Sequence, residues 1–155
     1  MRHRGKALCC SLLVLLLGAT TPVAAVQEAA FGSDRAAAVY FLRPLFPIMD
    51  CEGMGVVTKG EVEEHFFALF YSVSERGAFH LSHADLARAL PGSSALQVSY
   101  LFGMMDRDED GMVTTAEFHH FMLRAIELAD SGGKGEVTLA DVGLAPPRII
   151  RARDR

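Results

Sequence analysis

The chain has 155 residues, half of them hydrophobic, which is enough apolar material for one globular domain. All 19 acidic residues but only 12 of the 15 basic residues follow residue 25, so residues 26–155 carry a net charge of −7. This balance argues against nucleic acid or an anionic membrane as the partner and suits a chain that binds cations.

The first 25 residues have the three-part layout of a secretory signal peptide. A basic start at residues 2–6 precedes an apolar run at residues 7–19, and small residues follow at Val23 and Ala25. The run is shorter than the roughly 20 residues that a membrane-spanning helix needs. We therefore expect cleavage after Ala25 and a secreted or periplasmic protein; an uncleaved membrane anchor is the alternative.

Residues 26–145 are expected to form one domain, followed by a flexible basic tail at residues 146–155. Cys51 is the one cysteine after the expected cleavage point, so no disulfide can form within the mature chain. This thiol is either free or paired with a second chain. The sequence has no glycine-rich phosphate loop and no nucleophile with a base at recognisable spacing, so we do not expect an enzyme.

The first helix is expected from Asp34, as its N-terminal cap, to about Pro47, with Pro44 as a kink or break. A loop over residues 50–61 follows it. The side chains with oxygen atoms at loop positions 1, 3, 9 and 12 are Asp50, Glu52, Thr58 and Glu61. Position 5 is Met54, which offers no side-chain oxygen. The loop is therefore a weaker candidate site for a hard cation.

A helix near residues 60–71 leads to a second loop, which we place from Ser72 to His83. In that register Phe79 is the apolar residue at position 8, while Arg76 and His83 occupy the ligand positions 5 and 12. A cationic side chain at a ligand position opposes cation binding. This loop is therefore expected to bind no cation and to serve in pairing with another loop.

Two helices are expected next, at residues 83–90 and 94–105. The segment PGSS connects them, with Ser93 or Ser94 as the N-terminal cap of the second helix. Apolar residues recur at helical spacing in that second helix, which ends where a run of acidic residues begins.

The loop over residues 106–117 has an oxygen donor at every position that a chain wrapped around a cation requires. Positions 1, 3, 5, 7, 9 and 12 are Asp106, Asp108, Asp110, Met112, Thr114 and Glu117. Calcium takes six to eight oxygens at about 2.3–2.6 Å. We expect Met112 to give its backbone carbonyl, Thr114 to act through a water and Glu117 to give two oxygens. Gly111, at position 6, permits the sharp turn.

A helix at residues 115–129 leads to a fourth loop, residues 130–141, which keeps only part of this pattern. Its oxygen donors at positions 1, 9 and 12 are Asp130, Thr138 and Asp141. Gly132 and Lys134 stand at positions 3 and 5, and Lys134 adds a positive charge. We expect weak cation binding here at most. A brief helix is expected at residues 139–144.

The segment VSYLFGMMDRDEDGMVTTAEFHHFM, residues 98–122, has apolar residues at helical spacing on both sides of its acidic loop. It resembles an EF-hand, a calcium-binding helix–loop–helix unit. The resemblance implies an all-α fold of four EF-hand-like units, three of them degenerate, with calcium as the cofactor.

Loop starts at 50, 72, 106 and 130 leave only about ten to twelve residues between the first two loops and between the last two. Each interval must be one helix, about 15–18 Å long, that two loops share. Loops at opposite ends of one helix cannot pair, so we expect the loop at 72 to pair with that at 106, and the loop at 50 with that at 130. The spacing is similar to that of small secreted bacterial EF-hand proteins, including the lanmodulins. Lanmodulin loops carry proline at position 2, where this chain has Cys51, Val73, Arg107 and Ser131.

The resemblance implies a calcium-binding protein in which the ion mainly stabilises the fold. The alternative is a calcium-dependent sensor or adaptor that exposes a groove rich in methionine and phenylalanine to a protein partner. At helical spacing such residues more often form a core. Neither a nucleic-acid partner nor a membrane span after signal cleavage is expected.

Overall fold

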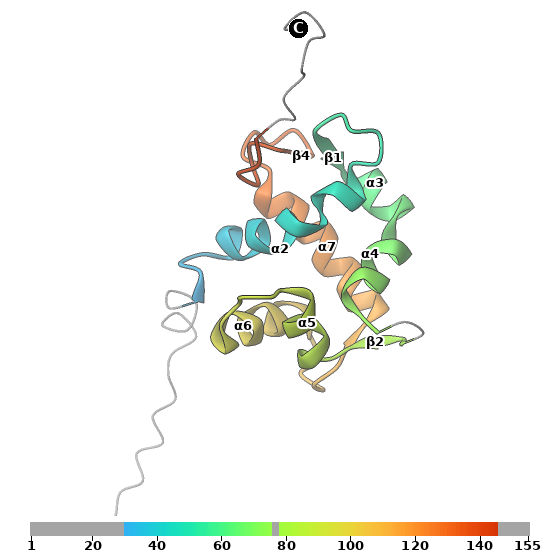
Figure 1. Cartoon of the computed structure of the whole chain (residues 1–155), viewed down its shortest axis with the longest axis vertical. Coiled ribbons are helices and arrows are strands. Elements are labelled where there is room, and N and C mark those ends of the chain that lie inside the picture. The colour runs from blue at the N-terminus through green and yellow to red at the C-terminus, as the bar shows by residue number, and fades with distance from the viewer. Residues whose placement is uncertain (1–29, 76–77, 146–155) are drawn as a thin grey trace, which may run out of the picture.

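The computed structural model describes residues 30–75 and 78–145, so the predicted signal peptide and basic tail lie outside the described residues. The described part is mostly helical, with two small antiparallel sheets (Figure 1). Its elements are α2 (Asp34–Met49), β1 (Val56–Thr58), α3 (Lys59–Glu64), α4 (Phe66–Val73), β2 (His80–Leu81), α5 (His83–Ala89), α6 (Ala95–Met105), β3 (Val113–Thr114), α7 (Thr115–Ala129) and β4 (Glu136–Thr138). Over the same residues, no helix combines the length and the apolar character that crossing a membrane requires.

Both sheets join loops that are far apart in the sequence. Strand β1 pairs with β4, with Val57 opposite Val137, and β2 pairs with β3, with Leu81 opposite Val113. All four of these central side chains are fully buried. The predicted pairing of the first loop with the fourth and of the second with the third is therefore confirmed. The strands also carry apolar side chains from the loops into the core.

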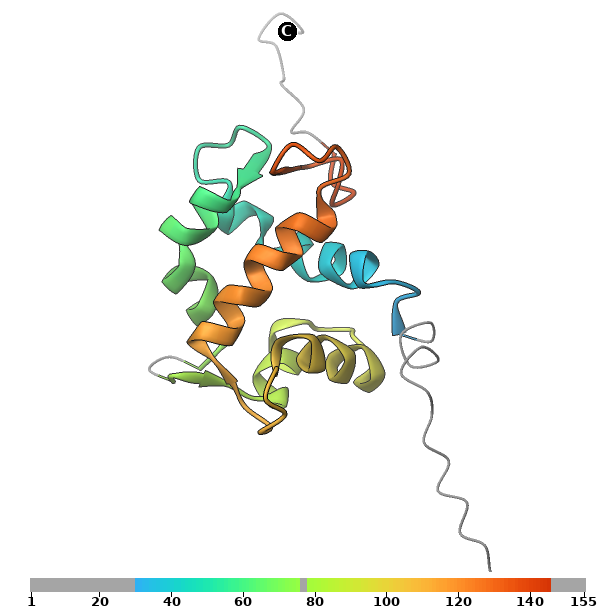
Figure 2. The ribbon, with the colours of Figure 1, turned by 180° about the vertical axis from the view of Figure 1, so that it is seen from behind.

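Helix α7 crosses the molecule from one sheet to the other (Figure 2). It begins directly after β3, six residues separate its end from β4, and its 15 residues span about 22 Å. Its buried side chains are Phe118, Phe121, Met122, Ala125, Ile126 and Ala129. Phe41 of α2 packs edge-on against Phe118 and Phe121, with ring centroids 6.1 and 5.2 Å apart. Helix α7 thus packs against α2 in the core and connects the loops at its own two ends.

Helix α2 differs from the expectation at both ends. Its cap is Ser33 and not Asp34, because the Ser33 side chain accepts a hydrogen bond from the Ala36 backbone N–H at 3.1 Å. The helix also continues through Pro44 and Pro47 to Met49. Both prolines are exposed, while the intervening apolar face is buried, so core packing on one face offsets the hydrogen bonds that proline removes on the other.

The helix predicted near residues 60–71 is divided at His65 into α3 and α4. The His65 backbone N–H donates to the Glu61 carbonyl, and the His65 carbonyl accepts from the Leu69 N–H, both at 3.0 Å. Helical hydrogen bonding therefore continues on both sides of the bend. Together α3 and α4 form one bent helical segment between the first and second loops, in agreement with the single shared helix expected from the loop spacing.

No helix forms at residues 139–144, where a brief one was predicted. The segment makes hydrogen-bonded turns, in which the Leu144 N–H donates to the Leu139 carbonyl at 2.8 Å. Gly143 has φ of +65°, a left-handed conformation that stops a right-handed helix after a single turn. The predictions at residues 83–90, 94–105 and 115–129 hold to within one residue, with Ser94 as the cap of α6.

We predict that Phe121→Ala lowers the free energy of unfolding by about 3–5 kcal/mol, because it leaves a cavity beside Phe41. Phe67→Ala is the matched control: Phe67 is 65% exposed, so its loss should cost under about 0.5 kcal/mol. Urea unfolding of both variants measures the difference. Equal destabilisation would contradict the division into core and surface aromatic residues.

Candidate metal centre

Three carboxylates of the 106–117 loop lie close together. Asp106, Asp108 and Glu117 each place an oxygen within 4.8 Å of the others, and no second such cluster occurs within residues 30–75 and 78–145. Asp106 caps the end of α6, where its N–H donates to the Phe102 carbonyl at 2.8 Å. Glu117 lies in the first turn of α7. Two helix ends therefore fix the first and the last carboxylate of the loop.

A capping box orients the Glu117 carboxylate. Its Oε2 accepts from the Thr114 backbone N–H at 2.9 Å and from the Thr114 hydroxyl at 2.8 Å, and its Oε1 accepts from the Arg107 N–H at 2.8 Å. The Thr114 backbone bond is the main cause that lowers the pKa of Glu117 below its usual value. Glu117 is thus ionised at neutral pH and held in position by the sequence pattern T-x-x-E.

Asp106 provides the clearest sign that this loop fits a cation. Its Oδ2 accepts a hydrogen bond from the Gly111 N–H at 3.0 Å. Its Oδ1 is buried and has no hydrogen-bond partner within the described part of the chain. A buried carboxylate oxygen without a donor is costly. A cation held between Asp106, Asp108 and Glu117 would satisfy this oxygen, and an all-oxygen donor set suits a hard cation.

The remaining predicted ligands of this loop lie outside the cluster. Asp110 Oδ1 accepts from the Met112 N–H at 2.8 Å, so this carboxylate is turned towards its own backbone. The Asp110 N–H donates in turn to Asp108 Oδ1 at 3.3 Å. Gly111 has φ of +86°, as the expected sharp turn requires. The structure therefore brings together three of the four predicted carboxylates.

The 50–61 loop has the same framework with fewer convergent acids. The Asp50 carboxylate accepts from the backbone N–H groups of Met54 and Gly55 at 2.8 and 2.9 Å. Glu61 Oε2 accepts from the Thr58 N–H and hydroxyl at 2.8 and 2.9 Å. Glu52 is exposed and belongs to no metal-ligand cluster in the described part of the chain.

The second loop lies in a register different from the predicted one. Leu81, and not Phe79, is the strand residue that faces the core, since Leu81 is fully buried and Phe79 is 80% exposed. Asp85 Oδ2 accepts from the Ser82 N–H and hydroxyl at 2.9 and 2.6 Å, as Glu117 does from Thr114. The loop therefore starts at Ser74, two residues later than predicted, and Asp85 replaces His83 at position 12.

A sequence signal for this register was present. The pattern S-x-x-D at residues 82–85 matches T-x-x-E at 58–61 and 114–117 and T-x-x-D at 138–141. Each is a capping box that closes a loop and starts a helix or turn. Loop starts at 50, 74, 106 and 130 give intervals of 24, 32 and 24 residues, a symmetric arrangement that the register from Ser72 obscured.

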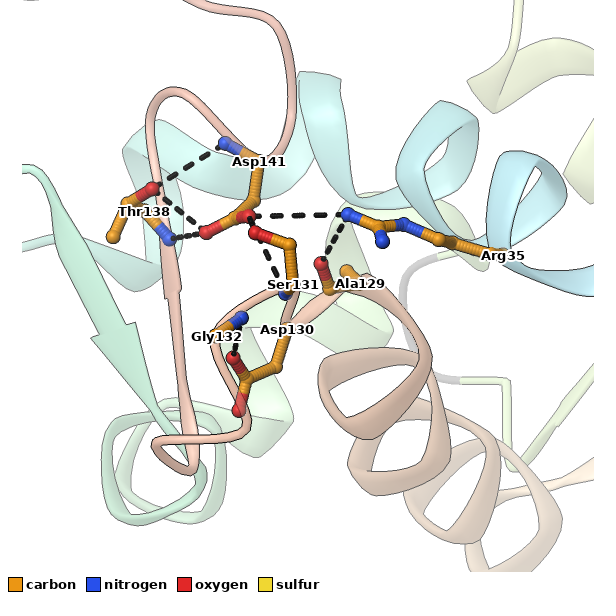
Figure 3. Close-up of polar contacts among 7 residues, drawn as sticks. All are labelled: Arg35, Ala129, Asp130, Ser131, Gly132, Thr138 and Asp141. Atoms are coloured by element: carbon orange, nitrogen blue, oxygen red, sulfur yellow. Dashed lines mark hydrogen bonds and ion pairs between the residues drawn. The ribbon is translucent and has the colours of Figure 1, made fainter.

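The 130–141 loop is closed by its own hydrogen bonds (Figure 3). Asp141 Oδ2 accepts from the Thr138 N–H at 2.9 Å and from the Thr138 hydroxyl at 2.7 Å. Asp141 Oδ1 accepts from the Ser131 hydroxyl and N–H, and the Arg35 guanidinium lies 3.9 Å away. These hydrogen bonds lower the pKa of Asp141 to about 2, and the bond from the Ser131 hydroxyl has the largest effect. Both oxygens of this carboxylate thus already have donors from the protein.

The Asp130 carboxylate also accepts hydrogen bonds from the protein. Its carboxylate accepts from the backbone N–H groups of Gly135 and Gly132 at 2.7 and 2.9 Å. The Gly135 bond is the leading cause that lowers the pKa of Asp130. Asp130, Thr138 and Asp141 therefore lie around one loop, as the sequence predicts, but form no cluster of three metal-ligating groups in the described part of the chain.

Comparison of the chain with protein-family models, with curated proteins and with solved structures found no match.

We predict that Asp141→Asn lowers the free energy of unfolding by about 2 kcal/mol near pH 7, because the folded pKa of about 2 lies below the usual aspartate pKa of 3.8. A depressed pKa contributes stability above pH 3.8, and this contribution is lost as the pH falls towards 2. The variant should therefore unfold with less dependence on pH between 4 and 2.

Urea unfolding at several pH values measures this difference. Glu64→Gln, a change at an exposed position of α3, is the control and should leave the profile unchanged. Identical acid profiles for Asp141→Asn and the unmodified protein would contradict the assignment.

Proposed function

We propose that this chain is a secreted or periplasmic EF-hand calcium-binding protein whose 106–117 loop binds one calcium ion, which mainly stabilises the fold. The observation that supports this most directly is the buried Oδ1 of Asp106, which has no donor within the described residues and belongs to the cluster with Asp108 and Glu117. Calcium would supply the positive charge that these oxygens lack.

The arrangement of the loops supports the proposal of four EF-hand-like units. Four capping boxes recur at equivalent loop positions, and each loop contributes a short strand to a pair. Paired loops joined by a two-stranded antiparallel ladder satisfy strand edges that one loop leaves open. In this proposal the three loops other than 106–117 are degenerate, and the 50–61 loop is the weaker candidate for a second ion.

The donor chemistry favours calcium over other metals. The cluster consists of carboxylates and contains neither histidine nor cysteine, which structural zinc prefers. Magnesium demands near-ideal octahedral geometry and usually keeps several waters, whereas calcium accepts a flexible shell of six to eight oxygens. A loop that adds the Met112 carbonyl and a second Glu117 oxygen to three carboxylates suits the larger ion.

The proposed location outside the cytoplasm favours a structural role for the calcium ion over a signalling role. Extracellular calcium-binding modules are tuned to about 10⁻⁴–10⁻³ M, whereas sensor loops bind at about 10⁻⁷–10⁻⁵ M. A site with a dissociation constant of about 1 µM that faces about 1 mM calcium stays occupied, and linkage then adds roughly 4 kcal/mol to the stability of the folded state. Constant occupancy favours a structural role.

We predict that Glu117→Gln weakens the tightest calcium site at least about tenfold, because it removes one charge and disturbs a bidentate ligand. Asp141→Asn is the matched control: it also neutralises a carboxylate at position 12, but its loop has glycine and lysine at positions 3 and 5 and forms no cluster of three metal-ligating groups in the described part of the chain. Calorimetric titration with calcium measures both affinities. An equal loss in the two variants would overturn the assignment of the site to residues 106–117.

Removal of calcium by a chelator should lower the melting temperature by about 10–20 °C and reduce the helix content, as expected for a loss of roughly 4 kcal/mol in a domain of this size. Circular dichroism during heating, with and without chelator, provides the measurement. Glu117→Gln should melt below the unmodified protein in the same calcium concentration, because each tenfold loss of affinity removes about 1.4 kcal/mol of this stabilisation. If the unmodified protein melts at the same temperature in both conditions, calcium does not stabilise the fold.

A sensor or adaptor is the second candidate function, supported by an apolar surface groove. A groove of about 350 Å³ between α3–α4 and α7 is lined by Glu63, Phe66, Phe67, Thr115, Ala116 and His119. Phe67 stacks with Tyr71, and both rings are exposed. Most other phenylalanines and methionines of the described chain are buried in the core, which favours the structural role. A well-folded chelated protein that binds an apolar dye only after calcium is added would favour the sensor instead.

The proposed location rests on the signal-like layout of residues 1–25. Protein purified from outside the cytoplasm should begin at Val26, or within a few residues of it, which mass spectrometry of the intact chain can show. An N-terminus that still carries residues 2–19 would be inconsistent with cleavage and would favour the membrane anchor.

A further inference from the structure

The four carboxylates at loop position 12 differ in their charged partners. In the two loops that lack acidic residues at positions 3 and 5, this carboxylate lies beside an arginine: Asp85 is 2.5 Å from Arg88, and Asp141 is 3.9 Å from Arg35. Within residues 30–75 and 78–145, neither Glu61 nor Glu117 has a lysine or arginine within ion-pair distance. An arginine is thus present where the loop has few anionic ligands and is missing where the loop keeps its acids.

Arg35 contacts the fourth loop from a distant part of the chain. It lies in the first turn of α2, and its Nη2 donates to the carbonyl of Ala129, the last residue of α7, at 3.2 Å (Figure 3). The same nitrogen lies 3.9 Å from Asp141 Oδ1. A cation is favoured at this position both by the carboxylate and by the partial negative charge at the C-terminal end of a helix.

The environment of Asp141 favours a positive charge nearby. The Asp141 side chain is only 9% exposed, whereas that of Arg35 is 48% exposed. A largely buried carboxylate is costly without donors or a counter-charge. Thr138 and Ser131 supply neutral hydrogen-bond donors to Asp141. Arg35 is the one cationic side chain within ion-pair distance of Asp141 in the described part of the chain.

We propose that Arg35 serves as the built-in counter-charge of Asp141 in the 130–141 loop, so that this position-12 carboxylate needs no metal ion. The loop then closes, and β1 pairs with β4, without calcium. The contact also fastens the start of α2 to the end of α7. Lys134, at position 5 of the same loop, adds a second positive charge that opposes binding of a metal ion. This proposal does not depend on calcium binding at residues 106–117.

Hydrogen exchange in the presence of a chelator tests the proposal directly. The backbone amides of β1 and β4 should be protected in the chelated protein. Arg35→Gln should speed their exchange by about three- to tenfold, the range expected for a partly exposed charge-assisted contact. Arg35→Lys keeps the charge and should retain most of the protection, which separates loss of the cation from loss of packing.

A double-mutant cycle identifies Asp141 as the group on which Arg35 acts. Asp141→Asn and Arg35→Gln together should speed exchange by less than the product of the two single effects, because each removes the same interaction. Arg43→Gln is the matched control. Arg43 is also in α2 and donates to the Gly143 carbonyl at 2.5 Å, but it forms no ion pair with a carboxylate of the described residues, so its effect should multiply with that of Asp141→Asn.

Two results would overturn the proposal. One is an unprotected β1–β4 pair in chelator that becomes protected only when calcium is added. The other is independent, multiplicative effects of the Arg35 and Asp141 substitutions. Since every measurement in the cycle is made without calcium, failure here leaves the calcium affinity of the 106–117 loop to be judged by its own titration.

Discussion

Backbone pairing between loops that are distant in sequence is the interaction on which the rest of this structure depends. A strand of two or three residues has too few hydrogen bonds to be stable alone. Each strand here also buries one apolar side chain, at Val57, Leu81, Val113 or Val137. The pairs therefore combine hydrogen bonding with core burial. Because α7 separates β3 from β4, each must pair with a strand from an earlier part of the chain.

The common framework of the loops explains how one structural unit can hold different chemistry. In every loop the carboxylate at position 12 accepts hydrogen bonds from the residue at position 9, so it has a structural role even without a cation. Its second oxygen is available for another partner. That partner is the Arg107 backbone for Glu117, an arginine for Asp85, and Ser131 with Arg35 for Asp141. The groups around the second oxygen thus differ from loop to loop, although the first oxygen has the same partner residue position in each.

The core places limits on how far the molecule can rearrange. The Phe118 ring of α7 makes edge-on contacts with Phe41 of α2 and with Phe70 of α4. Three helices therefore share one aromatic cluster. Moving α7 enough to expose this cluster would cost a large part of the buried apolar area. A structural role for the proposed calcium ion is consistent with this packing. The groove beside Phe66 and Phe67 is open without such a movement.

The sequence by itself determined features that depend on neighbouring residues. The spacing of acids in residues 106–117, most helix boundaries and the pairing of the loops all follow from periodicity and from helix length. Tertiary structure decided the rest. The register from Ser74 depends on which of Leu81 and Phe79 is buried, and α2 continues through two prolines because its other face packs in the core. Arg35 reaches Ala129 across 94 residues of sequence. Local spacing sets which groups a loop can offer, whereas the positive charge beside Asp141 comes from α2, which only the packing of the helices brings near.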